Sequence, residues 1–395
     1  MSGRLVEVSL EVILANQAPT GAYMAAPRYD TYAYSWLRDG AFIASAVDAF
    51  GRPQSAAAFH AWVARAVERH EAKVAALERE MAGGSGLAQD PLRILDEDLT
   101  LHTRFTPEGA EGAEAWGDFQ LDGYGFWLTS LAGHLARTGE SIEPYAASVD
   151  LVRRYLELAW EHPCYDSWEE YPGRRHVTTW AAIAQGLLAT DGLLDGAPSP
   201  VLARILGRLT AETSSDHVLR KFVPGEASVA GASIADPAGP AVAGHERVGR
   251  TLDPAAIDGS SLLVLGAFGP FPPGGETVSA TLEAVEKALV VEGGVHRYLD
   301  DEYYGGGLWV VLAGALAQVQ ATRDLARAEA TLRWIEAQAD DGGHLPEQVA
   351  SHLRVPSSER AWIDRWGPPA RPLLWSHAMY LLGVEAVEAA RSRAS

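Results

Sequence analysis

The chain has 395 residues, of which 47% are hydrophobic and 21% charged, a balance that can fill a sizeable globular core. Its 52 acidic and 32 basic residues give a formal net charge of −20. A surface this acidic repels nucleic-acid phosphates and anionic lipids, so we expect neither nucleic acid nor membrane as a partner. The single cysteine, Cys164, excludes an intrachain disulfide and a cysteine-rich metal site.

The first predicted element, residues 3–15, is an amphipathic helix in which Glu7 and Glu11 interrupt the apolar positions. A signal peptide has an unbroken apolar run instead. No stretch reaches the ~20 apolar residues that span a bilayer. We therefore expect a soluble, cytoplasmic protein.

Apolar residues recur at helical spacing along almost the whole chain. Glycine or proline marks several of the boundaries, as at Gly51, Pro53 and Gly139. The pattern predicts about twelve helices, which are, in chain order, 3–15, 37–50, 53–77, 122–138, 148–162, 177–194, 198–214, 258–268, 275–289, 308–322, 323–339 and 371–392.

Long connections without a regular pattern separate some of these helices. They span roughly 80–121, 162–176, 215–257, 290–307 and 340–370 and hold many of the clustered Trp and Tyr residues. Alternating long and short connections favour an all-α fold in which about twelve helices form six hairpins. We expect these to close into one (α/α)6 barrel over residues 1–395, with long functional loops at one end. An open helical solenoid remains an alternative, although no repeat of fixed length is visible.

Four loop stretches combine aromatic residues, carboxylates and Gly, and three of them also contain Arg. They are TYAYSWLRDG (31–40), AWGDFQLDGYG (115–125), CYDSWEEYPGRRH (164–176) and GGVHRYLDDEYYGGGLW (293–309). A fifth stretch, GGHLPEQ (342–348), places Glu347 after a Gly-Gly pair. Aromatic rings stack on the C–H faces of sugars, and polar side chains form hydrogen bonds with the sugar hydroxyls. Cleavage of a glycosidic bond needs two carboxyl groups, one protonated and one ionised. Apolar surroundings raise the pKa of a carboxyl, which suits the acid of such a pair.

Each of these signals is weak when taken singly. A carboxylate in a loop is more often a helix cap or a surface group than a catalytic residue, and a Trp in a loop more often packs against the protein than binds a sugar. We interpret His176 and His377 as polar lining or helix-end groups, since no His, Asp or Glu spacing supports a metal site. We therefore expect neither a metal nor a cofactor.

In chain order, however, YSWLRD, WGDFQLDG, YDSWEE, HRYLDDEYYGGGLW and LPEQ followed by LLWSHA resemble the motifs of family 15 glycoside hydrolases, the glucoamylase family. The resemblance covers residues from about 17 to 385. It implies an (α/α)6 barrel that cleaves α-glucosidic bonds from the non-reducing end with inversion.

The resemblance also implies roles for single residues. Glu169 would be the general acid and Glu347 the general base that holds the attacking water. Arg38, Asp39, Arg297 and Trp168 would bind the terminal glucose, and Tyr32 would lie near the reacting carbon. The remaining substrate-binding residues would be Trp36, Trp116, Asp122, Glu170, Tyr298, Trp309 and Trp375.

Departures from the family pattern bear on the substrate. Asp118 and Phe119 stand where starch-cleaving relatives have Arg-Pro, and His377 stands where a tyrosine is common. We also expect the chain to begin with the first barrel helix, without an accessory domain. We expect an exo-acting hydrolase of short α-1,6-linked gluco-oligosaccharides such as isomaltose. The alternatives are a glucoamylase-type α-1,4 hydrolase, a trehalase, and a glucan-sensing domain without catalysis. The sequence leaves both a monomer and a homo-oligomer open.

Overall fold

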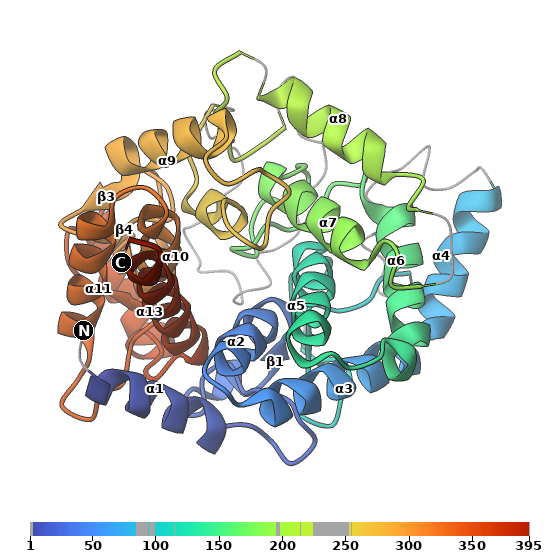
Figure 1. Ribbon diagram of the computed structural model, residues 1–395, viewed down its shortest axis with the longest axis horizontal. Helices are drawn as coiled ribbons and strands as arrows, with labels where there is room; N and C mark the ends of the chain where they lie inside the picture. Colours follow the sequence, from blue (N-terminus) through green and yellow to red (C-terminus); the bar gives the residue numbers. More distant parts are fainter. Residues whose placement is uncertain are drawn as a thin grey trace.

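In the computed structural model the chain folds into two concentric rings of helices (Figure 1). The structure describes residues 3–83, 94, 99–114, 116–194, 198–213, 215–223, 253 and 255–394. The outer ring contains α1 (Gly3–Ala15), α3 (Pro53–Arg69), α6 (Ala146–Ala159), α8 (Leu202–Glu212), α9 (Glu276–Leu289) and α11 (Leu325–Gln338). The inner ring contains α2 (Leu37–Ala49), α5 (Asp122–Thr138), α7 (Val177–Thr190), the 3₁₀ helix η4 (Gly259–Val264), α10 (Val310–Ala321) and α13 (Leu374–Ala394).

The inner ring is closed. Helix α2 packs against α5, α5 against α7, α7 against η4, η4 against α10, α10 against α13, and α13 back against α2. Alternating outer and inner elements along the chain make six pairs, so the fold is the predicted (α/α)6 barrel. Among the described residues no helix is long and apolar enough to cross a membrane.

Sequence patterns explain which ring a helix joins. Inner helix α10, VVLAGALAQVQA, is apolar on nearly every side, and a helix of this kind is stable only when it is surrounded by protein. Outer helix α8 buries a single stripe formed by Leu202, Ile205 and Leu209. Glycines allow inner helices to approach closely: a Cβ added at Gly186 would lie 2.6 Å from the carbonyl oxygen of Gly125 on α5.

Three predicted segments differ from the structure in more than the position of their ends. The predicted helix 53–77 is two helices, α3 and α4 (Glu71–Gly83), which are separated at His70. The segment 258–268 contains the short η4 rather than an α-helix. A tight bend follows it, in which a Cβ added at Gly269 would lie 1.6 Å from the carbonyl oxygen of Val264. The predicted connection 340–370 contains the helix α12 (Pro356–Trp366), which was missed because Ser358 is its only fully buried residue.

Short strands tie together the loops that enter the inner helices. Strand β1 (Ser35–Trp36) pairs with β2 (Arg104–Phe105). Strands β3 (Val290–Val291), β4 (Gly294–Val295), β5 (Leu308–Trp309) and β6 (Gln348–Val349) form an antiparallel sheet in that order. Short 3₁₀ helices, η1 (Asp30–Tyr32), η3 (Glu143–Tyr145) and η5 (Tyr303–Gly305), complete the connections. The sheet places the end of one long loop, at Trp309, opposite Gln348.

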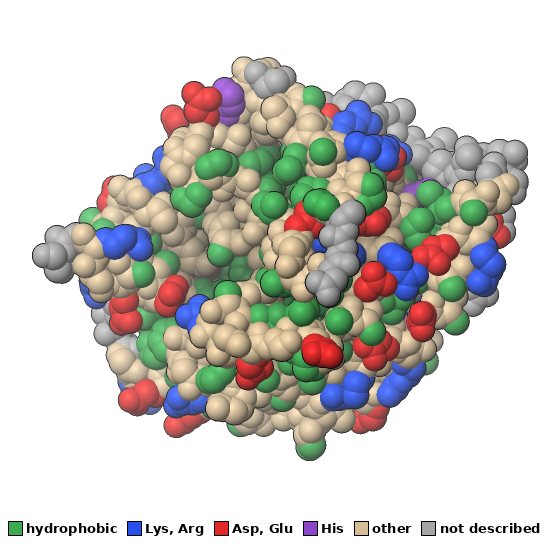
Figure 2. Space-filling model, turned by 45° about the vertical axis from the view of Figure 1, so that its right-hand side comes forward, with side chains coloured by type: hydrophobic (Ala, Val, Ile, Leu, Met, Phe, Trp, Pro, Cys, Tyr) green, Lys and Arg blue, Asp and Glu red, His purple; other side chains and the backbone are tan. Residues whose placement is uncertain are grey.

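Charged side chains of both signs are spread over the face seen in Figure 2, and apolar side chains gather around its central hollow. Four predicted motif loops, 31–40, 115–125, 164–176 and 293–309, lead directly into the inner helices α2, α5, α7 and α10. The N-terminal ends of the inner helices therefore carry the loops that the sequence marks as functional.

Candidate active site

A pocket of about 920 Å³, including its open mouth, lies among these loops. All but two of the predicted site residues line it. The lining includes Tyr32, Trp36, Arg38, Asp39, Trp116, Trp168, Glu169, Glu170, Arg297, Trp309, Glu347 and Trp375. The motif loops, which are far apart in the sequence, therefore meet at a single cavity.

Glu169 lies on a tight turn of the 164–176 loop, with a left-handed φ of 65°. Its Oε1 accepts hydrogen bonds from Trp36 Nε1 at 2.8 Å and from Gln120 Nε2 at 3.2 Å. Arg38 Nη2 lies 3.9 Å from the same oxygen. Two hydrogen bonds and one ion pair, from two other loops, thus hold one carboxylate oxygen in place. The second oxygen, Oε2, remains for a reacting partner.

Arg38 occupies the first turn of α2 and is 4% exposed. Its Nη1 donates to Gln120 Oε1 at 2.8 Å and lies 3.2 Å from Asp122 Oδ2. Asp122 is fully buried, does not line the pocket, and also accepts a hydrogen bond from Ser167 Oγ at 2.7 Å. Asp122 therefore supports Arg38 from behind, where the resemblance had implied a substrate contact.

Asp39, the neighbour of Arg38, lines the pocket and is nearly buried. Burial raises the pKa of Asp39 to about 7, although the positive charge of Arg38 opposes this rise. A carboxyl group with this pKa changes charge close to neutral pH. Hydroxyl groups that donate to it would favour its ionised form.

A second cation, Arg297, lies on the 293–309 loop. Arg297 forms two hydrogen bonds to Asp301, of 2.8 and 2.5 Å, and reaches Glu170 Oε1 at 3.3 Å. The guanidinium lies over the rings of Trp168 and Trp309, 5.3 and 5.2 Å from their centroids. These contacts fix the cation against two aromatic walls of the pocket.

Tyr298 is the second predicted residue that does not line the pocket. It is buried, and its hydroxyl donates to Glu170 Oε2 at 2.5 Å. Glu170 thus bridges Tyr298 and Arg297. Its carboxylate is held firmly, and the role of Tyr298 is support.

Glu347 is 5% exposed and precedes strand β6. Tyr32 donates to its Oε1 at 3.3 Å and Tyr303 to its Oε2 at 3.4 Å, while the two tyrosine hydroxyls lie 2.6 Å apart. Burial raises the pKa of Glu347 to about 8, against the opposing effects of Arg297 and the two tyrosines. A raised pKa was expected for the acid of the pair, and burial also raises the pKa of the predicted base.

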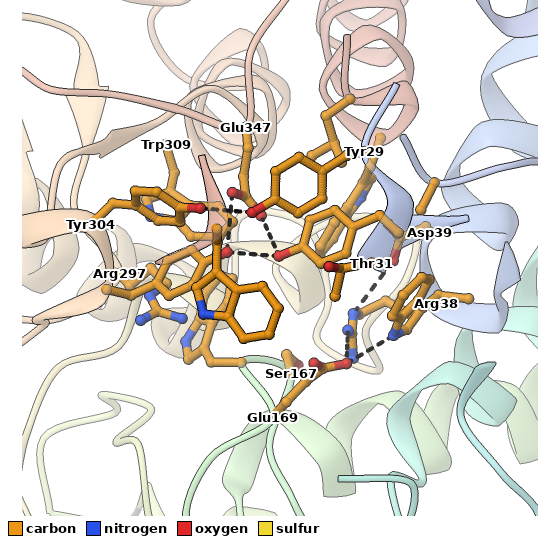
Figure 3. Close-up of a pocket in the computed structure, with 18 of the residues that line it drawn as sticks. Tyr29, Thr31, Arg38, Asp39, Ser167, Glu169, Arg297, Tyr304, Trp309 and Glu347 are labelled. Carbon is orange, nitrogen blue, oxygen red and sulfur yellow. Dashed lines mark hydrogen bonds and ion pairs between the residues drawn. The ribbon is translucent and has the colours of Figure 1, made fainter. Parts of the chain in front are cut away.

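Glu347 and Glu169 lie at opposite edges of the cluster in Figure 3, and they come from different loops. Tyrosine and aromatic side chains occupy the space around and between them. No group of three or more His, Cys, Asp or Glu residues suited to a metal ion occurs in the part of the chain that the structure describes. The arrangement is suited to acid–base chemistry on a bond that lies between two carboxyl groups.

Sequence reasoning missed several residues of the pocket wall, namely Tyr29, Thr31, Ser167, Tyr303, Tyr304, Trp362 and Trp366. Four of them, Thr31, Ser167, Tyr303 and Tyr304, belong to quoted motifs but received no role. Trp362 packs on Tyr303 with ring centroids 4.8 Å apart. Trp362 and Trp366 are four residues apart on α12, a spacing that places them on one helix face and could have identified them.

The two histidines have supporting roles, as expected. His377 accepts a hydrogen bond from the backbone N–H of Leu345, two residues before Glu347, at 3.0 Å. His176 Nε2 lies 2.9 Å from the carbonyl oxygen of Cys164. Both side chains are buried, and both hold loops of the pocket in shape.

The Asp118-Phe119 replacement lies outside the pocket lining. Phe119 is part of the core, and Asp118 Oδ2 lies 3.6 Å from His102 Nδ1. This pair therefore does not form the pocket wall, and its value as an indicator of linkage is lost. Most of the 215–257 connection, which the sequence argument also invoked, lies outside the described residues.

Comparison with known proteins gives consistent matches. The model of "Glycosyl hydrolases family 15" matches residues 5–366. The chain is 39% identical over 388 residues to an isomaltose glucohydrolase of Kribbella flavida, covering 96% of this chain and 91% of that protein.

Among solved structures, a wild-type glycosidase superposes with a TM-score of 0.79 at 37% identity, covering 98% of this chain and 96% of that one. A glutamate-to-alanine variant of a glycosidase, solved in complex with glucose, gives the same TM-score and coverage at 36% identity. A bacterial glucoamylase complexed with acarbose, 18% identical, has a TM-score of 0.68 over 97% of this chain and 55% of that one, which shows a shared fold.

Proposed function

The chain belongs to glycosyl hydrolases family 15 and is a glycoside hydrolase that acts on glucosides; on that premise we propose that it is an inverting, exo-acting α-glucosidase. It releases β-glucose from the non-reducing end of short α-1,6-linked oligosaccharides such as isomaltose. The observation that carries this proposal is the pocket in which Glu169 and Glu347 lie on different loops among aromatic side chains.

Glu169 acts as the general acid. Because its held oxygen, Oε1, already accepts from Trp36 and Gln120, Oε2 is the atom that carries the proton to the leaving oxygen. Proton donation to this oxygen neutralises the charge that develops as the C–O bond breaks.

Glu347 acts as the general base and holds the water that attacks the anomeric carbon. It must be ionised for this step, and both Arg297 and the two tyrosine hydroxyls favour its charged form. Its elevated pKa makes it a stronger base once the proton has left. In an inverting enzyme the two carboxyl groups stand roughly 6.5–9.5 Å apart, which leaves room for this water.

The terminal glucose is bound by charged groups whose positions are already fixed. Arg38 and Arg297 are each held by buried carboxylates, so their remaining donors are pre-oriented toward sugar hydroxyls. Trp168 and Trp309, with ring centroids 5.3 Å apart, offer an apolar wall. A wall that closes around one sugar restricts attack to the chain end, which makes the enzyme exo-acting.

The relative from Kribbella flavida supports the α-1,6 linkage, because it is named for isomaltose and is 39% identical over almost the whole chain. Comparison of kcat/KM for isomaltose, maltose and trehalose tests this assignment. Isomaltose is expected to be the best substrate. A higher kcat/KM for maltose would indicate a glucoamylase-type enzyme, and cleavage of trehalose alone would indicate a trehalase.

Substitution of the two carboxyl groups tests the mechanism. Glu169→Gln and Glu347→Gln should each lower kcat on isomaltose by about 10²–10⁴-fold, the usual contribution of general acid–base catalysis. Both variants should keep the far-ultraviolet circular dichroism of the wild type. Near-normal turnover by either variant would contradict the assignment of that residue.

A further inference from the structure

We propose that Lys221 is a positioning residue for the turn that carries Glu169, and that it acts through Asp166 and Asp258. Lys221 Nζ lies 2.6 Å from Asp166 Oδ2 and 2.6 Å from Asp258 Oδ2. All three side chains are at most 6% exposed. A buried ammonium group held between two carboxylates, outside the pocket lining, requires an explanation that the catalytic pair does not supply.

The second oxygen of each carboxylate accepts hydrogen bonds from the loop that carries Glu169, and that of Asp258 also accepts one from the backbone N–H of Ser260 at 2.8 Å. Asp166 Oδ1 accepts from the backbone N–H of Trp168 at 3.0 Å and of Glu170 at 2.8 Å, the residues on either side of Glu169. Asp258 Oδ1 accepts from Trp168 Nε1 at 2.8 Å. Lys221 thus fixes both carboxylates by one oxygen each, and the other oxygens grip the backbone and the indole of the same loop.

The turn needs this support because its backbone is unfavourable. Glu169 has φ 65° and Tyr171 has φ 53°, left-handed values that residues with a Cβ adopt only where surrounding contacts impose them. Without a cation between them, Asp166 and Asp258 would repel each other in a buried site. The turn would then lose the two acceptors that define its shape, and the carboxyl of Glu169 would be displaced.

Lys221 also contacts Tyr298, the residue that supports the carboxylate of Glu170. Its Nζ lies 4.5 Å from the ring centroid of Tyr298, whose hydroxyl donates to Glu170. The backbone of the Lys221 segment is itself anchored: Lys221 N–H donates to the carbonyl oxygen of Ala256 at 2.9 Å, and Val223 N–H to that of Arg175 at 3.0 Å. The backbone that carries the Lys221 ammonium group is therefore held in place by hydrogen bonds.

Lysine is chemically suited to this position. The sequence contains 32 basic residues but only three lysines, at positions 73, 221 and 287. An ammonium is a compact point charge with three donors, which can serve two carboxylates at 2.6 Å and still face an aromatic ring. The planar guanidinium of an arginine is larger and would push the two carboxylates apart.

The test rests on the proposed role of Glu169 as general acid. It uses two substrates whose leaving groups differ in how much they need protonation by an acid. Isomaltose needs a proton on the leaving oxygen, whereas fluoride leaves α-glucosyl fluoride with little help from an acid. Lys221→Met should lower kcat/KM on isomaltose by about 100-fold, the effect expected for a displacement of about an ångström. On α-glucosyl fluoride the loss should stay below about tenfold, since proton donation is not needed there. Lys221→Arg should show the same selectivity.

A second readout does not depend on activity. Amide hydrogen exchange over residues 164–176 should be faster in Lys221→Met than in the wild type, because the turn loses its clamp. Lys73→Met is the matched control. It removes a 2.7 Å ion pair with Glu111 away from the pocket and should change neither the substrate ratio nor the exchange of this segment.

Each outcome bears on the proposal. Equal losses on the two substrates, or unchanged activity and exchange, would overturn it. If Lys221→Met is not recovered as folded protein, the Asp258→Asn variant is measured instead. Its side chain keeps an oxygen that can accept from Trp168 but weakens the ion pair with Lys221. The same selective loss of activity on isomaltose is expected. Glu169→Gln serves as the reference: if it shows no selectivity between the substrates, the acid assignment fails instead. If the wild-type protein does not cleave isomaltose, only the proposed α-1,6 specificity is refuted. The activity on α-glucosyl fluoride would then be compared with that on the disaccharide that the enzyme does cleave.

Discussion

Glu347 offers a prediction in which stability, rather than activity, reports on the electrostatics of the site. Its carboxyl is 5% exposed, and burial raises its pKa from the ordinary 4.5 to about 8. Glu347→Gln replaces the titrating carboxyl by a neutral amide of the same shape. The variant therefore removes the pH dependence that this single group imposes on folding.

The sign and the size follow from the two pKa values. In the unfolded chain Glu347 loses its proton near pH 4.5, whereas in the folded protein the pKa of about 8 keeps the proton bound up to higher pH. Its contribution to the free energy of unfolding is complete below about pH 4.5 and is lost as pH rises through about 8. A pKa difference of about 3.5, at about 1.4 kcal/mol for each, sets a maximum loss of about 5 kcal/mol.

The assay is urea denaturation of wild type and Glu347→Gln, followed by circular dichroism at a series of pH values from about 5 to about 9. Relative to the variant, the wild type should lose about 1.4 kcal/mol in its free energy of unfolding for each pH unit, and the difference should level off above about pH 8. Glu283→Gln, on the exposed side of α9, should leave the pH dependence unchanged. Parallel curves for wild type and Glu347→Gln over this range would refute the reasoning.

Two further predictions concern binding. Because burial raises the pKa of Asp39 to about 7 and sugar hydroxyls favour its charged form, KM for isomaltose should fall as pH rises from about 6 to about 8. Initial rates should show this trend for the wild type and a flat KM for Asp39→Asn; a flat wild-type profile would contradict the role of Asp39. Digestion of dextran, followed by chromatography of early products, should yield glucose alone, whereas early release of isomaltose would contradict the exo-acting pocket.

Most of the barrel could be predicted because the spacing of apolar residues along a helix indicates which of its sides are buried. Inner helices such as α10 are apolar on nearly all sides, and outer helices such as α8 carry one stripe, so both patterns are visible in the sequence. Helix α12 escaped because it is largely polar and buries little. The division at His70 and the 3₁₀ form of η4 depend on tertiary packing, which periodicity does not record.

The site was predictable to the extent that its residues lie within compact motifs. The motif loops led to both carboxyl groups and to most of the aromatic wall. Asp122 and Tyr298 were placed in the pocket because a motif specifies which loop a residue belongs to, but not the direction of its side chain. Lys221 had no local signal, since its partners Asp166 and Asp258 are 55 and 37 residues away.

The anomeric form of the first product tests the central claim most directly. Proton nuclear magnetic resonance, recorded during the first minutes of isomaltose hydrolysis before the sugar mutarotates, distinguishes α- from β-glucose. A general base at Glu347 that activates water opposite the acid Glu169 predicts that β-glucose appears first. Initial formation of α-glucose would mean retention and a nucleophilic carboxylate, and would contradict the roles assigned to this pair.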